Sequence, residues 1–233
     1  MPPSQPDWSL PTAYERWYAS SLGRAYEASL TRVLQPWLSH TSGCSVLDIG
    51  CGPGLEMERL FPPGARIIGL DCSLNMARRA FERNRQAGQY RPLVIGSATR
   101  IPLADGLFDL AFSLNCLEFV DDRQAAFREI ARMLRPSGTA IVGVLNRVSV
   151  WEWTRKLWGL FSRKPYYRGR FFRANEVERL CTEVGLYIEE VKHGVYFPPI
   201  PPGPFQCFYN WLDQWFQRHR LGAGAVILFR VRS

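Results

Sequence analysis

The sequence predicts an α/β fold in which helices cover both faces of a mainly parallel sheet, and three observations carry this prediction. Short apolar runs of β-favouring residues alternate along the chain with segments of helical periodicity. The first run, VLDI at 46–49, ends in the glycine-rich stretch GCGPG, and the next, ARIIGLD at 65–71, ends in an acid. Such alternation builds parallel sheets, whose ligands bind beyond the carboxyl ends of the strands.

The first part of the chain carries most of the alternation. Aromatic and apolar residues at helical spacing predict one or two helices over 12–39, and Pro36 is expected to kink or end the second. Ser73 is the expected N-cap of the helix after the second strand. The expected elements up to residue 146 are a strand at 46–50, a helix at 55–61, a strand at 65–71, a helix at 73–88, strands at 91–96 and 107–113, a helix at 122–135 and a strand at 138–145.

After Asn146 the pattern changes to a basic and aromatic segment at 151–172. The expected elements that follow are a helix at 174–185, a strand at 186–194, a proline-rich loop at 198–204, a helix at 205–219 and a strand at 225–233. We therefore expect a single domain over residues 1–233, made of an N-terminal helical cap (1–40), a ligand-binding core (41–146), a basic aromatic insert (147–172) and the C-terminal part of the sheet (173–233).

Composition narrows the class of protein. The chain has 233 residues, 46% of them hydrophobic, which is enough for a full core. Its six cysteines form no CxxC pair and its three histidines have no metal-ligand spacing, so we expect reduced thiols and no metal. Neither the N-terminus nor the late apolar run AGAVILF resembles a signal or a membrane span, and a cytoplasmic location is expected. The net charge of +8 favours acidic partners such as nucleic acid, anionic lipid or anionic small molecules.

The glycine-rich loop after the first strand predicts a nucleoside site. It reads GxGxG with Leu55 where a dinucleotide fingerprint needs its last glycine, so a pyrophosphate ligand is disfavoured. Asp71, at the end of the second strand, is placed to accept hydrogen bonds from both hydroxyls of a ribose. Structural alternatives remain for each feature: the glycines permit close packing, Asp48 caps a helix, and Asp71 is a turn residue before Ser73.

Several motifs, in order and at matching spacing, resemble those of the class I S-adenosylmethionine-dependent methyltransferases, particularly the small-molecule group of ubiquinone and menaquinone methyltransferases. VLDIGCGPG resembles the first motif of that family, IIGLDCSLNM the second and GSATRIPLADGLFDLAFS the third. CLEFVDD and REIARMLRPSGTAIVGV resemble the region after the fourth strand and the fifth strand. The resemblance covers roughly residues 12–146 and the closing strand pair. It implies a Rossmann-like, doubly wound, mainly parallel seven-stranded sheet with an antiparallel closing strand, N-terminal helices and a helical cap insert.

The resemblance also implies S-adenosylmethionine as the cofactor and S-adenosylhomocysteine as the product. It places the glycine loop under the methionine and ribose parts, Asp71 on the ribose, and Tyr14 of the motif YERWY at the methionine end. The cofactor-binding residues that it implies are Tyr14, Asp48, Gly50, Cys51, Gly52, Gly54, Asp71, Cys72, Met76, Ser97, Ala98, Asn115, Cys116 and Leu117.

Two positions depart from the pattern of the family. Ser97 stands where the family often has an acid that accepts a bond from the adenine amino group. A serine hydroxyl can accept that bond but carries no charge, so we expect a weaker or water-mediated contact. Phe119 stands where the family often has a histidine that faces the substrate, so an acid or base there is lost or not needed.

Other residues near these motifs admit two interpretations. Tyr14, Trp17 and Tyr18 belong either to the core or to a lid, and Tyr14 and Tyr18 are weak catalytic candidates. Arg24 is either a solvated charge or a partner of the carboxylate of the cofactor. The cysteines at 51 and 116 are interpreted as small space-filling residues.

The segment 151–170 predicts an amphipathic basic helix. Its aromatic face would carry Trp151, Thr154, Trp158 and Phe161. The segment is either a lid with solvated charges, the wall of an apolar substrate pocket, or a membrane-surface contact. A nucleic-acid groove is a further alternative, but no RNA-binding module is visible. The residues expected to face the substrate are Phe119, Trp151 and Trp158.

Two functions remain open on the sequence alone. The first is an enzyme that methylates a small, apolar or amphiphilic molecule at O, N or C by in-line displacement. Alignment matters more than bond activation in such a transfer, and the sequence commits no histidine or carboxylate to the role of a base. The second is a catalytically silent S-adenosylmethionine-binding protein that acts through a partner. A small-molecule substrate is expected and nucleic acid is not, while the methyl acceptor and the oligomeric state are left open.

Overall fold

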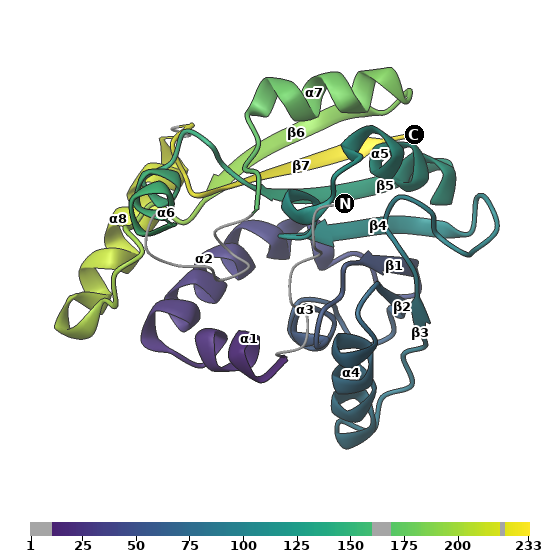
Figure 1. Ribbon diagram of the computed structural model, residues 1–233, viewed down its shortest axis with the longest axis horizontal. Coiled ribbons are helices and arrows are strands. Elements are labelled where there is room, and N and C mark those ends of the chain that lie inside the picture. The colour runs from purple at the N-terminus through teal and green to yellow at the C-terminus, as the bar shows by residue number, and fades with distance from the viewer. Residues whose placement is uncertain (1–10, 160–168, 220–221) are drawn as a thin grey trace.

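A seven-stranded sheet organises the protein, whose computed structural model describes residues 11–159, 169–219 and 222–233, without the side chains of residues 155 and 157–159 (Figure 1). The strand order is β3-β2-β1-β4-β5-β7-β6. Strand β7 runs antiparallel to both of its neighbours, and the other pairs are parallel. The predicted closing strand is therefore confirmed. The strands are β1 Ser45–Ile49, β2 Arg66–Asp71, β3 Leu93–Ile95, β4 Phe108–Leu114, β5 Leu134–Leu145, β6 Tyr187–Gly194 and β7 Val226–Arg232.

Helices lie on both faces of this sheet (Figure 1). They are α1 Pro11–Tyr18, α2 Ser21–Leu38, α3 Leu55–Arg59, α4 Leu74–Gln86, α5 Arg123–Met133, α6 Val150–Gly159, α7 Ala174–Glu183 and α8 Gln206–Arg218, with short 3₁₀ turns η1 Leu117–Phe119 and η3 Gly203–Phe205.

The alternation of side chains along each strand divides the core in two. In β7, for example, Leu228 belongs to the core cluster that includes residues of α1, α2 and α3, while Phe229 belongs to the cluster that includes residues of α5 and α7. A parallel sheet buried on both faces needs apolar residues at successive positions, which explains why its strands show continuous apolar runs rather than alternation. The predicted doubly wound arrangement is confirmed.

Local signals place several boundaries, and one expected boundary is wrong. Ser73 caps α4, because its Oγ accepts a bond from the amide of Met76 at 3.3 Å. Pro36 lies inside α2, which continues to Leu38, so the proline does not end the helix directly. The helix expected to reach residue 135 ends at Met133, because Leu134 already pairs with Phe108 in the sheet. Long-range pairing overrides helical periodicity there.

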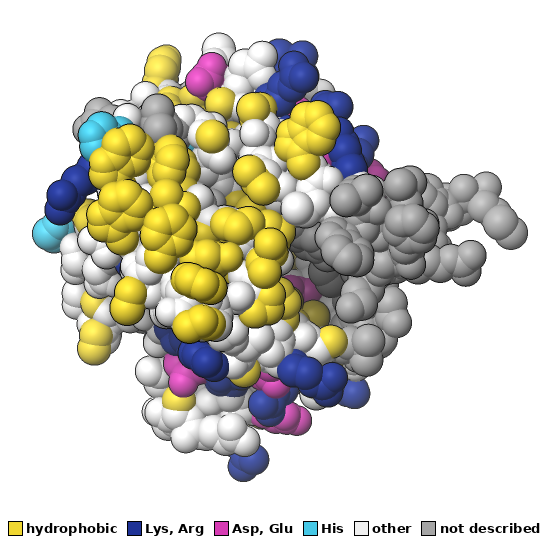
Figure 2. Space-filling view, turned by 90° about the vertical axis from the view of Figure 1, so that its left-hand side faces the viewer, with side chains coloured by type: hydrophobic (Ala, Val, Ile, Leu, Met, Phe, Trp, Pro, Cys, Tyr) yellow, Lys and Arg dark blue, Asp and Glu magenta, His cyan; other side chains and the backbone are white. Residues whose placement is uncertain are grey.

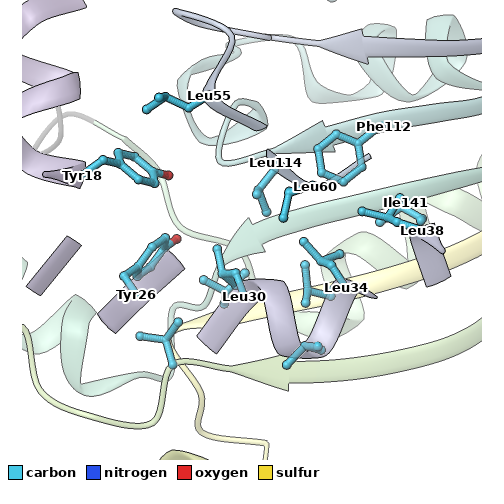
Figure 3. Close-up of a cluster of buried hydrophobic side chains, with 14 of the residues drawn as sticks. Tyr18, Tyr26, Leu30, Leu34, Leu38, Leu55, Leu60, Phe112, Leu114 and Ile141 are labelled. Atoms are coloured by element: carbon cyan, nitrogen blue, oxygen red, sulfur yellow. The ribbon is translucent and has the colours of Figure 1, made fainter. Parts of the chain in front are cut away.

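The core beneath α2 holds the largest cluster of leucines and aromatic rings (Figure 3). Phe112 of β4 is fully buried, and its ring lies edge-on to that of Phe61 with the ring centroids 5.2 Å apart. Tyr18 and Tyr26 lie at one end of the same cluster, which thus extends to the end of the sheet where the strands stop (Figure 3).

We predict that Phe112→Ala lowers the free energy of unfolding by about 3 to 5 kcal/mol, because it removes a buried ring and leaves a cavity. Phe81→Ala is the matched control: the ring of Phe81 is 60% exposed on α4, so the change should stay within about 0.5 kcal/mol. Urea denaturation of both variants checks this. Equal losses would contradict the assignment of Phe112 to the core.

Candidate functional site

The sequence-predicted residues gather at the edge where the parallel strands end. The loop after β1 contributes the glycines, the end of β2 contributes Asp71, and the segment after β4 contributes Asn115. The chain after β3 lies against β2, since the amide of Gly96 donates to the carbonyl oxygen of Asp71 at 3.1 Å. Residues from four strands are thus brought to one edge, as the topology of the sheet requires.

The three positions of the loop require glycine for different structural reasons. All have positive φ: 78° at Gly50, 53° at Gly52 and 81° at Gly54. A Cβ at Gly50 would collide with the sulfur of Cys116, and one at Gly54 would press on Ala80 at 3.2 Å. At Gly52 a Cβ would meet nothing within 4 Å. Close packing therefore accounts for Gly50 and Gly54, whereas Gly52 leaves its backbone beside open space.

Asp71 connects the glycine loop to the start of α4. Its Oδ2 accepts the amide of Gly52 and its Oδ1 accepts the amide of Ser73, both at 2.8 Å. The side chain is 9% exposed, and burial raises its pKa although the two amides oppose this rise. Asp71 is thus a turn residue that also fixes the loop. Each oxygen keeps a further lone pair that could accept a hydroxyl.

Asp48 is buried below the same loop and its charge is poorly compensated. It is 2% exposed, and its Oδ2 has no hydrogen-bond partner among the described residues. Burial raises its pKa well above the usual value, with further contributions from Glu56 and Asp71. The N-cap residue of helix α3 is Gly54 and no side chain caps the helix, so the capping alternative for Asp48 is wrong. A buried acceptor of this kind is costly unless something pairs with it.

Glu56 is a site residue that sequence reasoning missed. The hydroxyls of Tyr14 and Tyr18 both lie within hydrogen-bond distance of its Oε1, at 3.3 and 3.2 Å. Burial raises the pKa of both tyrosines and of Glu56, so the phenols remain protonated donors. In the sequence, Glu56 is an acid two residues after Gly54 in the first turn of a short helix. This local pattern does not indicate which distant side chains it contacts.

Asn115 is held in an unusual conformation by a second missed residue, Tyr26. Its φ is 54°, and its side-chain amide exchanges two hydrogen bonds with the Tyr26 hydroxyl, at 2.8 and 3.1 Å. The ring of Tyr26 lies 5.3 Å from that of Trp17 and 5.5 Å from that of Trp151, between ring centroids. The aromatic residues of the N-terminal helices therefore belong to the core and also border the site.

Of the three predicted substrate-facing residues, Trp151 belongs to this cluster, and the side chain of Trp158 lies outside the described residues. Trp151 is 4% exposed and its Nε1 donates to the carbonyl oxygen of Phe197 at 2.7 Å. Phe119 is half-buried in η1. Trp151 therefore packs as a core residue, and contact with a substrate stays a prediction for all three.

The remaining predicted cofactor residues differ in exposure. Cys72 and Ser97 are exposed, and Ala98 is half-buried. The Ser97 hydroxyl lies 2.8 Å from that of Thr99. Leu117 is fully buried, in the core cluster that includes residues of α5. Met76, at the start of α4, is also buried.

Cys51 and Cys116 are disfavoured as nucleophiles, and Arg24 lies at the surface. Burial raises the pKa of the thiols of Cys51 and Cys116 well above the usual value, which disfavours a nucleophilic thiolate. Arg24 is exposed and donates to the carbonyl oxygen of Ala19. Among the described residues, no group of three or more His, Cys, Asp or Glu side chains is arranged to hold a metal ion.

Glu118, in the segment after β4, is a further residue that the sequence did not single out. It is 2% exposed, and one oxygen accepts the amide of Leu145 at the end of β5. Its other oxygen has no partner among the residues described. Burial raises its pKa to about 7, while the amide of Leu145 and the charge of Arg123 act in the opposite direction. The sequence signal was an acid inside the apolar run CLEFV.

We predict that Glu118→Gln removes a pH dependence of stability. The raised pKa means that the folded state binds its proton more tightly than the unfolded state, so the free energy of unfolding falls as the pH rises from 4.5 through about 7. The variant keeps the acceptor for Leu145. Its free energy of unfolding should equal that of the wild type near pH 4.5 and exceed it by about 3 kcal/mol above pH 7. Denaturant titrations across this range check the difference. A difference that is constant with pH would contradict it.

The described part of the chain contains no helix that is both long and apolar enough to cross a lipid bilayer.

Comparisons with known proteins agree with this architecture. The pattern of a methyltransferase domain family matches residues 47–142. The chain is 33% identical over 120 residues to an O-methyltransferase of Aspergillus nomiae, which is 50% of this chain and 53% of that protein. It thus spans about half the length of that relative. Its structure resembles an S-adenosylmethionine-dependent methyltransferase of Thermotoga maritima, a possible histamine N-methyltransferase, with a TM-score of 0.69 at 23% identity over 95% of this chain and 94% of that one.

A longer match comes from the ubiquinone biosynthesis O-methyltransferase of Idiomarina loihiensis. The two are 31% identical over 177 residues, which cover 70% of each chain. With the family pattern across β1 to β5 and the confirmed strand order, this match shows that the chain belongs to the class I S-adenosylmethionine-dependent methyltransferases.

Proposed function

We propose that this protein transfers the methyl group of S-adenosylmethionine to a small, apolar or amphiphilic acceptor. The observation that carries the proposal is the arrangement around Gly52, where a backbone bend beside open space meets the buried carboxylates of Asp71 and Asp48. The proposal includes a cytoplasmic location and a small-molecule acceptor rather than nucleic acid.

The charges around the loop suit a cationic ligand. Asp48, Glu56 and Asp71 lie close enough that the charges of Glu56 and Asp71 raise the pKa of Asp48 further. Within the residues described, the cation that opposes this rise is Arg91. When bound, S-adenosylmethionine supplies a methyl group on a positively charged sulfur, and it also carries an ammonium group. Such a ligand would relieve the repulsion among the three acids.

The residues of this chain would hold the cofactor in separate parts. The backbone at Gly52 leaves room for the ligand, and the free lone pairs of Asp71 would accept the ribose hydroxyls. Asp48 keeps an oxygen that has no partner among the described residues and could accept a donor of the cofactor. The other proposed contacts are those of Tyr14, Gly50, Cys51, Gly54, Cys72, Met76, Ser97, Ala98, Asn115, Cys116 and Leu117.

The reaction would depend on alignment. Fixing two reactants in line can lower a barrier by roughly 7 to 11 kcal/mol, and the aligned groups must not move. Tyr26 fixes Asn115 through two hydrogen bonds, and Glu56 fixes Tyr14 and Tyr18. Because the pKa of each of these two tyrosines is raised by burial, they would position groups as donors and would not act as bases.

The apolar character of the acceptor is inferred from the aromatic rings next to Asn115. Trp17, Tyr26 and Trp151 pack edge to face or tilted against one another on the side of the N-terminal helices. The half-buried Phe119 adds apolar surface where the family often has a histidine. An acceptor with an apolar body would gain most from such surroundings.

We predict that Asp71 contacts the ribose. Changing the protein and the ligand separately and together distinguishes this contact from the effect of Asp71 on the conformation of the loop. Asp71→Ala should weaken S-adenosylhomocysteine binding by more than about tenfold, since it removes charge-assisted hydrogen bonds. The 2′-deoxy and 3′-deoxy forms of the ligand should bind the wild type about tenfold more weakly than the parent ligand does. On the variant, the deoxy forms and the parent ligand should bind with almost equal affinity. Calorimetry measures all six affinities. If the deoxy forms lose as much affinity on the variant as on the wild type, Asp71 acts only on the loop.

We predict turnover with a small-molecule acceptor. Incubation of the protein with methyl-labelled S-adenosylmethionine and a cell metabolite extract should place label in a new small molecule, and Gly52→Val should reduce the transfer at least about tenfold by filling the open space. A side chain at this φ is strained, so the thermal stability of the variant is measured alongside. Binding of the cofactor without any labelled product would favour the silent binding protein.

A further inference from the structure

An exposed aromatic surface lies at the end of the molecule formed by α6 and α8. Figure 1 shows the two helices at the same end of the sheet, and Figure 2 looks onto that end, where apolar side chains gather. The two helices meet through Phe197. Its carbonyl oxygen accepts the Trp151 indole of α6 at 2.7 Å, and its ring stacks on that of Tyr209 in α8, with the centroids 5.1 Å apart.

The exposed members of this surface, which we call the aromatic end face, are large. Trp153 is 75% exposed on α6, and Phe205 is 65% exposed in η3. Soluble proteins rarely expose apolar side chains in such a group without a partner. The aromatic end face consists of Trp153, Ile200, Phe205, Phe208, Trp211 and Trp215.

The exposed charged side chains described on α6 and α8 are positive. Their carboxylates, Glu152 and Asp213, are 4% and 1% exposed and form ion pairs with Lys156 and Arg32. The sequence from 195 to 205 contains no acid. Arg218 and Lys156 are exposed. The described surface of α6 and α8 therefore presents cations and aromatic rings but no exposed carboxylate.

We propose that the aromatic end face docks on the surface of an anionic lipid bilayer. Tryptophan and phenylalanine enter the interfacial region, and arginine and lysine bind anionic headgroups, so both kinds of exposed residue gain from this partner. The net charge of +8 adds long-range attraction. A second copy of the chain fits less well, because a two-fold contact would bring the cations of one face near those of the other.

The aromatic end face is joined to the candidate site by packed rings. Trp151, buried two residues before the exposed Trp153, contacts Tyr26, which in turn holds Asn115. Docking by this end would bring the aromatic side of the site next to the headgroup region, where amphiphilic molecules collect. The docking itself is independent of the proposed methyl transfer and can be tested without any substrate.

Flotation with vesicles tests the proposal on the full chain. Vesicles of phosphatidylcholine with phosphatidylglycerol should bind the wild type at low salt and release it as the salt concentration rises. The double variant Phe208→Ser/Trp211→Ser should bind at least about tenfold more weakly. The matched control is Phe81→Ser/Tyr90→Ser, which removes two rings that are 60% and 93% exposed on other parts of the surface and should bind as the wild type does.

Two further measurements locate the contact. Brominated phosphatidylcholine should quench the tryptophan fluorescence of the wild type, and Trp211→Phe should reduce that quenching. Circular dichroism and thermal unfolding establish that the variants are folded. The proposal is overturned by absence of binding at low salt, by equal binding of the double variant, or by a dimer of the wild type that the double variant loses while neither binds vesicles.

Discussion

The hydrogen bond between the Asp71 carboxylate and the amide of Gly52 is the contact on which the site depends. It joins the end of β2 to the loop after β1, and the second bond from the same carboxylate, to Ser73, sets the start of α4. Three segments are therefore positioned by one side chain. Because the carboxylate is buried, these charge-assisted bonds are stronger than they would be in water, and the positive φ of Gly52 is maintained against its conformational freedom.

Two buried acids, one in β1 and one in the segment after β4, are poorly compensated. Asp48 and Glu118 are almost fully buried, and each has one oxygen without a partner among the described residues. Burial raises the pKa of both, which means that their ionised forms destabilise the free protein. Strained or uncompensated groups gather at functional sites in many proteins. The family to which the chain belongs uses a cofactor with a positively charged sulfur, and the position of Asp48 is consistent with that use.

The N-terminal helices and α6 both complete the core and lie next to the residues of the candidate site. Trp17, Tyr26 and Trp151 pack against one another on one face of the sheet, and the Tyr26 hydroxyl fixes Asn115 at the edge where the strands end. Helix α6 buries Trp151 and exposes Trp153, so one short helix contributes to the core and to the outer aromatic surface. Substitutions in α6 therefore affect the core and that surface at neighbouring positions.

The sequence by itself determined the order of helices and strands, the glycine loop, the place of Asp71 at the end of β2 and the Ser73 cap, because these depend on periodicity and on contacts between near neighbours. It also indicated the family. Only the tertiary structure decided that Glu56 meets Tyr14, that Tyr26 meets Asn115 and that Glu118 meets the end of β5. It also decided that Asp48 caps no helix and that Leu134 joins β5. Each of these depends on partners at least 26 residues away or on burial by several elements. Local patterns do not encode which distant side chains meet, and that pairing is settled by packing across the sheet.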